Sequence, residues 1–240
     1  MNKKRKKPVV IIIIIPLVLI VIAVFAFFQL APQFGAVPSK ERLINRALNS
    51  RYEGGKFMNT ENTPVILPNS YGRMIKQQFN NNPGRVPDRP LPANLPDFGN
   101  DSLSNALSVI WLGHSTVLIR IQGITIITDP VFSERVSPVS FLGPRRFETA
   151  HEISIGDLPA IDIVLISHDH FDHLDHKTIK ALDHNVKTFI VPLGIRDHLE
   201  KWGVLPEKIC ELDWWESSSV SGLQFNCTPA RHFSALASVS

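Results

Sequence analysis

The sequence predicts an α/β domain with mixed sheets and outer helices, preceded by one transmembrane helix. Two observations lead to this prediction: a long uncharged apolar run near the N-terminus, and a later series of short strand-like runs that begins to alternate with helical patterns. No internal repeat is visible. The chain therefore divides into a basic flank at 1–7, a membrane-spanning segment at 8–31, a spacer or wrapping arm at 32–105, and a folded domain at 106–240.

The N-terminal apolar run is long enough to cross a bilayer. Residues 9–28 are 20 consecutive uncharged residues, and no charged residue occurs from Pro8 until Lys40. A helix of about 20 residues spans the roughly 30 Å hydrocarbon core of a membrane. A cleaved signal peptide would have a shorter apolar region and a small-residue cleavage site, for which "FGAVPS" is a poor candidate, and a core helix would carry Pro16 in its middle. We therefore expect an uncleaved anchor in the cell membrane.

Five basic residues at positions 3–7 precede this run and have no acid among them. The positive-inside rule places them in the cytoplasm and the folded body on the periplasmic or extracytoplasmic side, with association with the outer membrane left open. They also account for the formal net charge of +3, because the rest of the chain is near −2. The folded body therefore lacks the basic excess of a nucleic-acid-binding domain, and the expected partner is the lipid bilayer.

Residues 32–105 are rich in proline and asparagine, which favours an extended spacer or an arm that wraps around the body. Helical patterns occur only around 40–49 and 74–79. The two cysteines of the chain, Cys210 and Cys227, lie in separate apolar segments without a C-x-x-C spacing, so no zinc ribbon or redox motif is expected. Both a disulfide and two packed thiols stay open from the sequence.

The folded domain begins with strands. Three short runs follow one another, separated by Gly113, His114 and Gly123, and predict an antiparallel meander: "ALSVIWL", "STVLIRI" and "ITIITDP". An irregular loop at 131–150 comes next. The run "IDIVLIS" is continuously apolar, as in a strand covered on both faces.

Helices and strands then alternate. We expect helices in "DHKTIKALDH", with Asp175 as N-cap, and in "GIRDHLEKWG", which Gly203 ends. The intervening strands are expected in "KTFIVP", "KICELDWW" and "GLQFNCTPARH". His176, His184 and His198 fall in or near the helical segments, so we assign them to surface faces.

The stretch "SHDHFDHLD", residues 167–175, follows the buried strand and has the order H-x-H-x-D-H. A sharp loop can direct His168 and His170 toward one point, and Asp172 and His173 toward a second point nearby. Imidazole nitrogens suit zinc and a carboxylate adds a hard ligand, so one loop can supply two metals that hold a hydroxide for hydrolysis. The alternative is a solvated histidine-rich loop.

This stretch resembles the signature of the metallo-β-lactamase superfamily. The resemblance covers roughly residues 106–234 and extends to its N-acylphosphatidylethanolamine phospholipase D-like branch, with bacterial relatives labelled outer membrane protein RomA; the motifs that carry it are "WLGHSTVLIRIQGITIITDPVFSERVSPVSFLGPRRF", "LPAIDIVLISHDHFDHLD", "ELDWWESS" and "TPARHFS". It implies the N-terminal part of an αββα sandwich and a zinc hydrolase.

The resemblance also implies a ligand set. The first Zn²⁺ would be held by His168, His170 and His232. The second would be held by Asp172 and His173, with Asp172 also orienting the attacking hydroxide as the catalytic carboxylate.

Four further residues are candidates around these ligands. Asp129 resembles the acid that orients the ligands from behind, although it is also a turn-forming residue before Pro130. His114 is either a substrate contact or a capped turn histidine, and Arg145 and Arg146 either hold a phosphate or form a solvated basic pair.

One departure from the family affects the expected activity. The family has a bridging aspartate and a further histidine beyond the position of His232, and here the sequence after "RHFS" runs "ALASVS". We therefore expect a C-terminally truncated domain that binds one zinc weakly and has an incomplete second site. We expect a membrane-anchored zinc hydrolase of the phospholipase D-like kind, which cleaves a phosphodiester or phospholipid-like substrate by attack of a metal-activated hydroxide. The alternatives are an impaired, truncated envelope protein and a lactonase of the same fold.

Overall fold

The computed structural model describes residues 7–48, 51–53, 56–61, 70–80, 84–98 and 107–234. The chain divides into two compact units, Met1–Phe34 and Gly35–Ser240. The first unit contains α1 (Lys7–Leu30), which is helical through Pro16, and the 3-10 turn η1 (Pro32–Phe34). Side chains of α1 are described from Ile14 onward. Among the residues that the structure describes, no helix is both long enough and apolar enough to cross a membrane.

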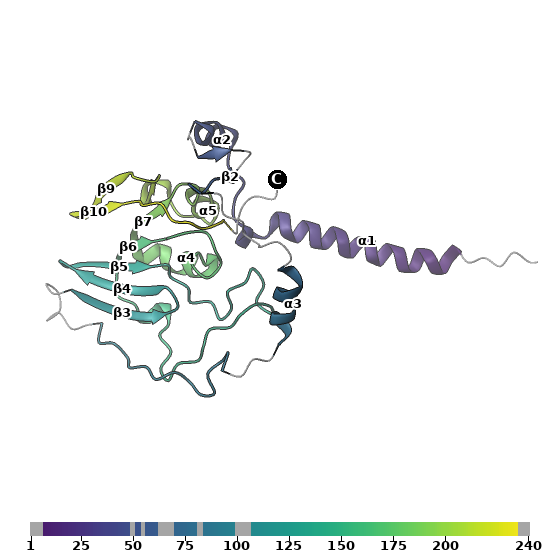
Figure 1. Ribbon diagram of the computed structural model, residues 1–240, viewed down its shortest axis with the longest axis horizontal. Helices are drawn as coiled ribbons and strands as arrows, with labels where there is room; N and C mark the ends of the chain where they lie inside the picture. The colour runs from purple at the N-terminus through teal and green to yellow at the C-terminus, as the bar shows by residue number, and fades with distance from the viewer. Residues whose placement is uncertain are drawn as a thin grey trace, which may run out of the picture. The chain divides into compact units, whose positions relative to one another are not determined.

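A six-stranded mixed sheet forms the body of the second unit (Figure 1). Its strands follow chain order and are β3 (Ser108–Gly113), β4 (Thr116–Ile121), β5 (Ile124–Thr128), β6 (Ile161–Leu165), β7 (Val186–Pro192) and β8 (Ile209–Leu212). The pairs β3–β4 and β4–β5 are antiparallel, whereas β5–β6, β6–β7 and β7–β8 are parallel. The meander and the strand–helix alternation expected from the sequence are both confirmed.

Two helices cover one face of this sheet, where the main core lies. They are α4 (His176–Leu182) and α5 (Arg196–Lys201), with the 3-10 turns η3 (Ile155–Asp157), η4 (Asp183–Asn185) and η5 (Pro206–Lys208) alongside. Their residues Ile179 and Leu199 are fully buried against Phe189 of β7. Asp175 caps α4, its side chain accepting the N–H of Lys177 at 3.1 Å, as the sequence predicts.

The opposite face of the sheet carries a smaller apolar cluster. Ile126, Ile163 and Ile190 are buried there beneath a two-stranded hairpin of β9 (Ser217–Val220) and β10 (Leu223–Asn226). Strand β9 was not predicted, because "SSSV" has little apolar pattern. Cys210 and Cys227 both pack in this cluster as free thiols.

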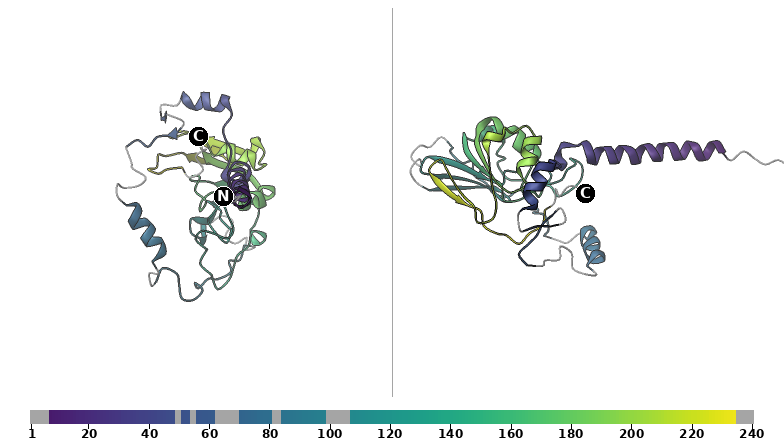
Figure 2. Two further views of the ribbon diagram at one scale, coloured as in Figure 1. Left: turned by 90° about the vertical axis from the view of Figure 1, so that its right-hand side faces the viewer. Right: turned by 90° about the horizontal axis from the view of Figure 1, so that it is seen from above.

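Parts of the predicted arm form helices and a short hairpin. These are α2 (Lys40–Ala47), a short hairpin of β1 (Tyr52–Glu53) and β2 (Lys56–Phe57), and α3 (Tyr71–Phe79), as the views in Figure 2 also show. Arg42 and Arg46 of α2 both pair with Asp197 of α5. Helix α2 therefore contacts the domain, whereas the residues of α3 from Tyr71 to Gln77 are exposed.

The assignment of His198 to a surface face is wrong. His198 is buried, and its Nδ1 accepts the backbone N–H of Ala36 at 2.8 Å. Helical spacing alone does not reveal that the arm covers this side of α5. His176 is half-buried with its ring centroid 5.0 Å from that of Trp202, whereas His184 is exposed.

Candidate metal centre

The candidate site forms at one edge of the sheet. Strands β5 and β6 are parallel, so Asp129 and Ser167, which follow them, meet at their carboxyl ends. Strand β4 is antiparallel to β5, with Val117 opposite Thr128, so the β3–β4 turn that carries His114 lies at the same edge. Ligands bind outside the carboxyl ends of strands in open α/β sheets because loops converge there. The topology therefore brings three separate loops to one place.

The loop after β6 folds back on itself. The carbonyl of His170 accepts the backbone N–H groups of His173 at 2.9 Å and Leu174 at 2.7 Å. Leu174 is buried in the main core, and Phe171 packs against that core. Burial of the apolar residues of the loop leaves its histidines and Asp172 at the surface edge, where they can meet a ligand.

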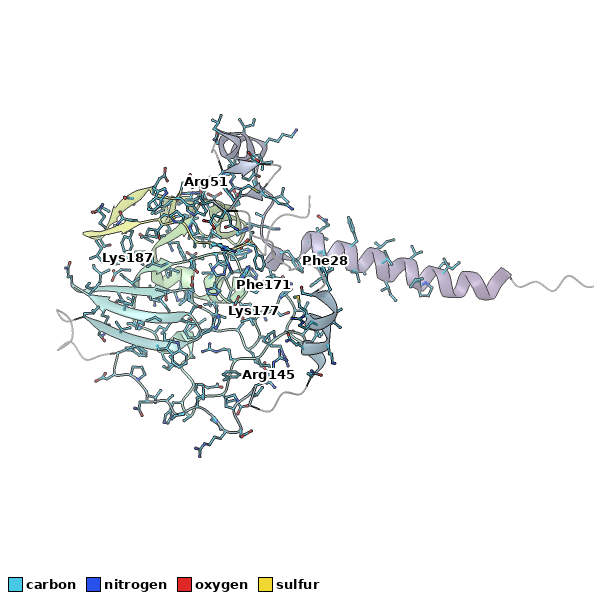
Figure 3. All side chains as sticks on the ribbon, viewed as in Figure 1. Phe28, Arg51, Arg145, Phe171, Lys177 and Lys187 are labelled. Atoms are coloured by element: carbon cyan, nitrogen blue, oxygen red, sulfur yellow. The ribbon has the colours of Figure 1, made fainter. Side chains whose placement is uncertain are left out.

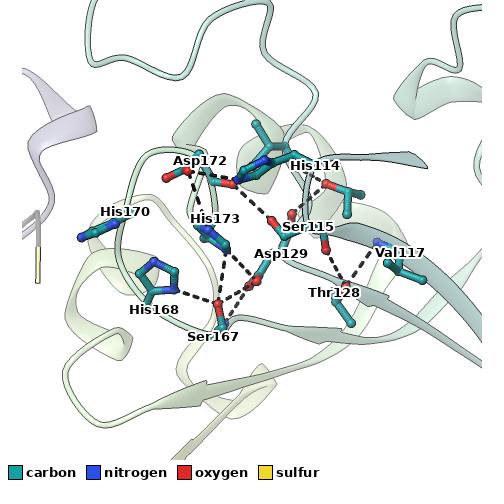
Figure 4. A network of polar contacts seen from close by, with 12 residues as sticks. His114, Ser115, Val117, Thr128, Asp129, Ser167, His168, His170, Asp172 and His173 are labelled. Atoms are coloured by element: carbon teal, nitrogen blue, oxygen red, sulfur yellow. Dashed lines mark hydrogen bonds and ion pairs between the residues drawn. The ribbon is translucent and has the colours of Figure 1, made fainter. Parts of the chain in front are cut away.

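Two groups of potential ligands result. The first contains His168, His170 and His232, and the second contains His114, Asp172 and His173. Within each group, one donor atom from every residue lies within 4.8 Å of the others. The rings of His168 and His173 are 4.0 Å apart between centroids, so the two groups adjoin (Figure 4).

Asp129 joins the two groups from behind. Its buried carboxylate accepts the backbone N–H and the hydroxyl of Ser167, each at 2.7 Å, and Nδ1 of His173 at 2.9 Å (Figure 4). The backbone of Asp129 has a positive φ of 37°, a conformation that non-glycine residues seldom adopt and that costs about 1 kcal/mol or more. The fold holds this carboxylate in place despite that cost.

These hydrogen bonds decide which ring nitrogens are available. The single hydroxyl proton of Ser167 goes to the Asp129 carboxylate, which can only accept, so Nδ1–H of His168 donates to Ser167 Oγ at 2.9 Å. His168 Nε2 therefore carries a free lone pair. In His173 the proton on Nδ1 faces Asp129 and leaves Nε2 free in the same way.

The free nitrogens fit a cation. His168 Nε2 and His170 Nε2 are buried and have no hydrogen-bond partner among the described residues. Buried polar atoms without a partner are rare because each costs about 1–3 kcal/mol. A divalent cation would satisfy both, and imidazole donors are typical of zinc, copper, iron and nickel sites.

The surroundings favour a neutral imidazole at His168 and an ionised carboxylate at Asp172. Burial lowers the pKa of His168 to about 4, and the neighbouring imidazoles add to this effect. Burial opposes ionisation of Asp172, but its own backbone N–H, His173 and His114 together hold the pKa of its carboxyl below the usual value. Burial likewise opposes protonation of His173, yet its hydrogen bond to Asp129 raises the pKa of that imidazole.

His114 lies closer to the ligands than the sequence indicated. Its Nε2 is 3.0 Å from Asp172 Oδ2, and it sits in the left-handed region with a φ of 46°. Trp111 Nε1 donates to the carbonyl of His114 at 2.8 Å and fixes the turn. The second group thus has three candidate ligands, whereas sequence reasoning placed two there.

The two arginines have other partners. Arg146 is half-buried and donates to the carbonyls of Val131 at 2.7 Å and Leu112 at 2.9 Å, and burial lowers its pKa. Arg145, which Figure 3 labels, is exposed and pairs with Glu134. Ser167 was missed by the sequence reasoning, although its position directly before His168 is a signal that could have found it.

Comparison with protein families agrees with this geometry. Residues 125–239 match the description "Beta-lactamase superfamily domain". These residues form a beta-lactamase superfamily domain. They include Asp129, the histidine-rich loop and His232, whereas β3, β4 and His114 precede the matched segment of this beta-lactamase superfamily domain.

Similar proteins extend the comparison. Rv0906, an uncharacterized protein of Mycobacterium tuberculosis, is 46% identical over 149 residues, which is 62% of this chain and 40% of that protein. The N-acyl-phosphatidylethanolamine-hydrolyzing phospholipase D 1 of Caenorhabditis elegans is 36% identical over 161 residues, 62% of this chain and 44% of that enzyme. The matched part thus spans less than half the length of these relatives.

A solved structure shows a weaker likeness. Igni18, a metallo hydrolase from the archaeon Ignicoccus hospitalis, superposes with a TM-score of 0.42 at 20% identity, over 55% of this chain and 52% of that one.

Proposed function

We propose that this chain is a metal-dependent hydrolase that holds Zn²⁺ and cleaves a phosphodiester in a phospholipid-like substrate. The observation that carries the proposal is the pair of adjoining three-residue groups, one with two buried and unpartnered imidazole nitrogens. Zinc is the cation we favour because the donors are imidazoles with one carboxylate, the set that zinc hydrolases use.

The first group would hold one cation through three imidazoles. His168 is preset for this role, because Ser167 fixes its tautomer and burial keeps it neutral. The second group would hold another through His114, Asp172 and His173. Bound cations at such a site act as Lewis acids and lower the pKa of water toward neutrality.

The protein's own residues would orient the reactants. Asp172 is ionised at neutral pH and can accept a proton from an attacking water, while His114 holds one of its oxygens. Asp129 would keep His173 in one tautomer and orientation through its Nδ1 hydrogen bond. Arg145 and Arg146 already have partners, so we assign binding of the phosphate charge mainly to the cations.

The substrate class follows from relatives. The Caenorhabditis elegans relative is a phospholipase D that hydrolyses N-acyl-phosphatidylethanolamine, and this supports a phosphodiester next to an acyl-bearing lipid. Lactone hydrolysis uses the same kind of site and differs in the bond that is cleaved. A lactone substrate therefore serves as the second arm of the test.

We further propose that residues 8–31 tether the protein to the cell membrane, with the basic residues 3–7 in the cytoplasm and the body on the other side. Support comes from the sequence, where 32 residues without a charge follow five basic ones. Resistance of the membrane-bound protein to alkaline carbonate extraction, together with release by detergent, is the expected result. Release by carbonate alone would contradict the tether.

The test of the hydrolase uses the full chain purified in detergent. We expect bound zinc by elemental analysis, and hydrolysis of N-acyl-phosphatidylethanolamine in mixed micelles and of a chromogenic phosphodiester. His168→Ala should abolish the activity, and His184→Ala, which changes an exposed histidine outside both groups, should retain it. Hydrolysis of a lactone alone would redirect the proposal, and zinc-loaded protein without any activity would favour an impaired envelope protein.

A further inference from the structure

The backbone of His232 is held by a residue that lies 173 positions earlier in the chain. The side-chain amide of Asn59 donates from Nδ2 to the carbonyl of His232 at 2.8 Å, and its Oδ1 accepts the N–H of His232 at 3.2 Å. One amide thus satisfies both backbone groups of one candidate ligand. Flipping the amide would set donor against donor and acceptor against acceptor, so the contact admits only one orientation.

His232 needs such support because its own segment has no regular structure. Strand β10 ends at Asn226, and the described residues that follow it up to Ser234 form neither helix nor strand. A hydrogen bond from the Ser234 hydroxyl to Asp169 gives the segment one further link to the histidine-rich loop. Other ligands of the first group, in contrast, come from a loop that is anchored by β6 and the buried Leu174.

Asn59 itself is fixed by the β1–β2 hairpin and its neighbours. Met58 N–H donates to the carbonyl of Arg51 at 2.7 Å, and the Arg51 guanidinium donates to Thr60 at 3.0 Å. The same guanidinium lies over the ring of Trp214, with its central carbon 4.9 Å from the ring centroid. Residues 51–53 and 56–61 are therefore tied to the body through Arg51 and Asn59.

We propose that Asn59 is a positioning residue of the metal centre, so that the arm is a structural part of the first cation site. The ring of His232 lies 4.5 Å from the rings of both His168 and His170, between centroids, and its Nε2 is 3.2 Å from His170 Nδ1. A small shift of the His232 backbone would move its imidazole out of reach of the other two. Residues that orient metal ligands typically contribute 10- to 100-fold to metal affinity.

This inference rests on the proposed metal site. Two measurements distinguish a failure of the role of Asn59 from a failure of the metal site itself. The first is zinc affinity of the full chain in detergent, by competition with a chromophoric chelator. Asn59→Ala and Asn59→Asp should each weaken zinc binding about 10- to 100-fold. The aspartate is nearly isosteric and sets a carboxylate oxygen against the His232 carbonyl, so it should do no better than alanine. Asn185→Ala, which removes a comparable amide contact to the Pro159 carbonyl, should bind zinc as the wild type does.

The second measurement needs no metal. Amide hydrogen exchange of the metal-free full chain should be at least ~10-fold faster over the peptide at 228–234 in Asn59→Ala than in the wild type, because the His232 N–H loses its acceptor. Exchange over β6 should be unchanged, which shows that the domain stays folded. If the wild type holds no zinc, the proposed function fails while the exchange result still decides the role of Asn59. Two results would overturn the role of Asn59. One is that Asn59→Ala exchanges over 228–234 as slowly as the wild type does. The other is that the wild type binds zinc and the Asn59 variants bind it equally tightly.

Discussion

His173 Nδ1 and Asp129 Oδ2 lie 2.9 Å apart, although 44 residues separate them in the chain. This contact couples the end of β5 to the loop after β6 and leaves the opposite nitrogen of the imidazole free for a ligand. The same carboxylate reaches His168 through Ser167. One buried acid therefore orients an imidazole in each of the two candidate groups.

Asp129→Ala should weaken zinc binding about 10- to 100-fold, because His173 and His168 both lose the hydrogen bonds that fix their rings. Chelator competition of the full chain measures this. Asp183→Ala, which removes an acid that pairs with Lys208 away from both groups, serves as the control and should leave the affinity within about 2-fold. Equal affinities for all three proteins would show that Asp129 has no role in orienting the ligands.

Removal of metal should lower the thermal stability of the body. A cation that binds only the folded state at 100 times its Kd stabilises it by about 2.7 kcal/mol, which corresponds to roughly 5–10 °C in Tm for a domain of this size. Calorimetry with and without a chelator should show this difference in the wild type. In His170→Ala the chelator should lower Tm by less than in the wild type, since that variant lacks a ligand of the first group but keeps the second.

Arg146→Met should destabilise the fold by about 3 kcal/mol, because two carbonyls of the buried residues Leu112 and Val131 lose their charged donor. Arg145→Met is the matched control. Its guanidinium is exposed and pairs with an exposed Glu134, so the expected cost is below about 1 kcal/mol. Urea denaturation of both variants measures the difference, and equal midpoints would argue against the buried clamp.

The free energy of unfolding of the metal-free protein should decrease as the pH is lowered, because His168 becomes protonated. Its pKa is about 4 in the folded state and 6.5 in the unfolded state, so the unfolded chain binds more protons between these values. The stability that the neutral His168 contributes is therefore fully present above about pH 6.5, and it is lost as the pH falls to about 4. After discounting for partial exposure, we expect it to be about 1–2 kcal/mol.

His173 acts in the opposite direction, because its raised pKa favours the folded state at low pH. The measurement is therefore a comparison of wild type with His168→Gln, by urea denaturation from pH 4 to 8 in the presence of a chelator. A smaller loss of unfolding free energy toward pH 4 in the variant is expected. Parallel curves would exclude His168 as a source of the pH dependence.

Much of the fold was predictable because its information is local. The meander at β3–β5, the buried strand β6 and the helices α4 and α5 each have an apolar period or a capping residue within a few positions. The short hairpin strand β9 has neither signal and was missed. The pairing of the six strands of the main sheet is also local in the chain, since each strand pairs with the one that precedes or follows it in the sequence.

The candidate site was predictable only in part. His168, His170, Asp172 and His173 lie on one loop after one strand, so their proximity follows from the sequence itself. The approach of His114 to Asp172 depends on the register of β4 with β5, which no local pattern determines. Similarly, the role of Arg146 depends on which carbonyls the long loop brings to it.

The sequence by itself determined that imidazoles and a carboxylate gather behind a buried strand, because neighbours on a short loop cannot separate. Tertiary structure alone decided that Asn59 holds His232, that the arm buries His198, and that Asp129 joins the two ligand groups. These contacts connect residues up to 173 positions apart. Chain proximity says nothing about such pairs, since they form only when packing of the whole domain brings distant segments together.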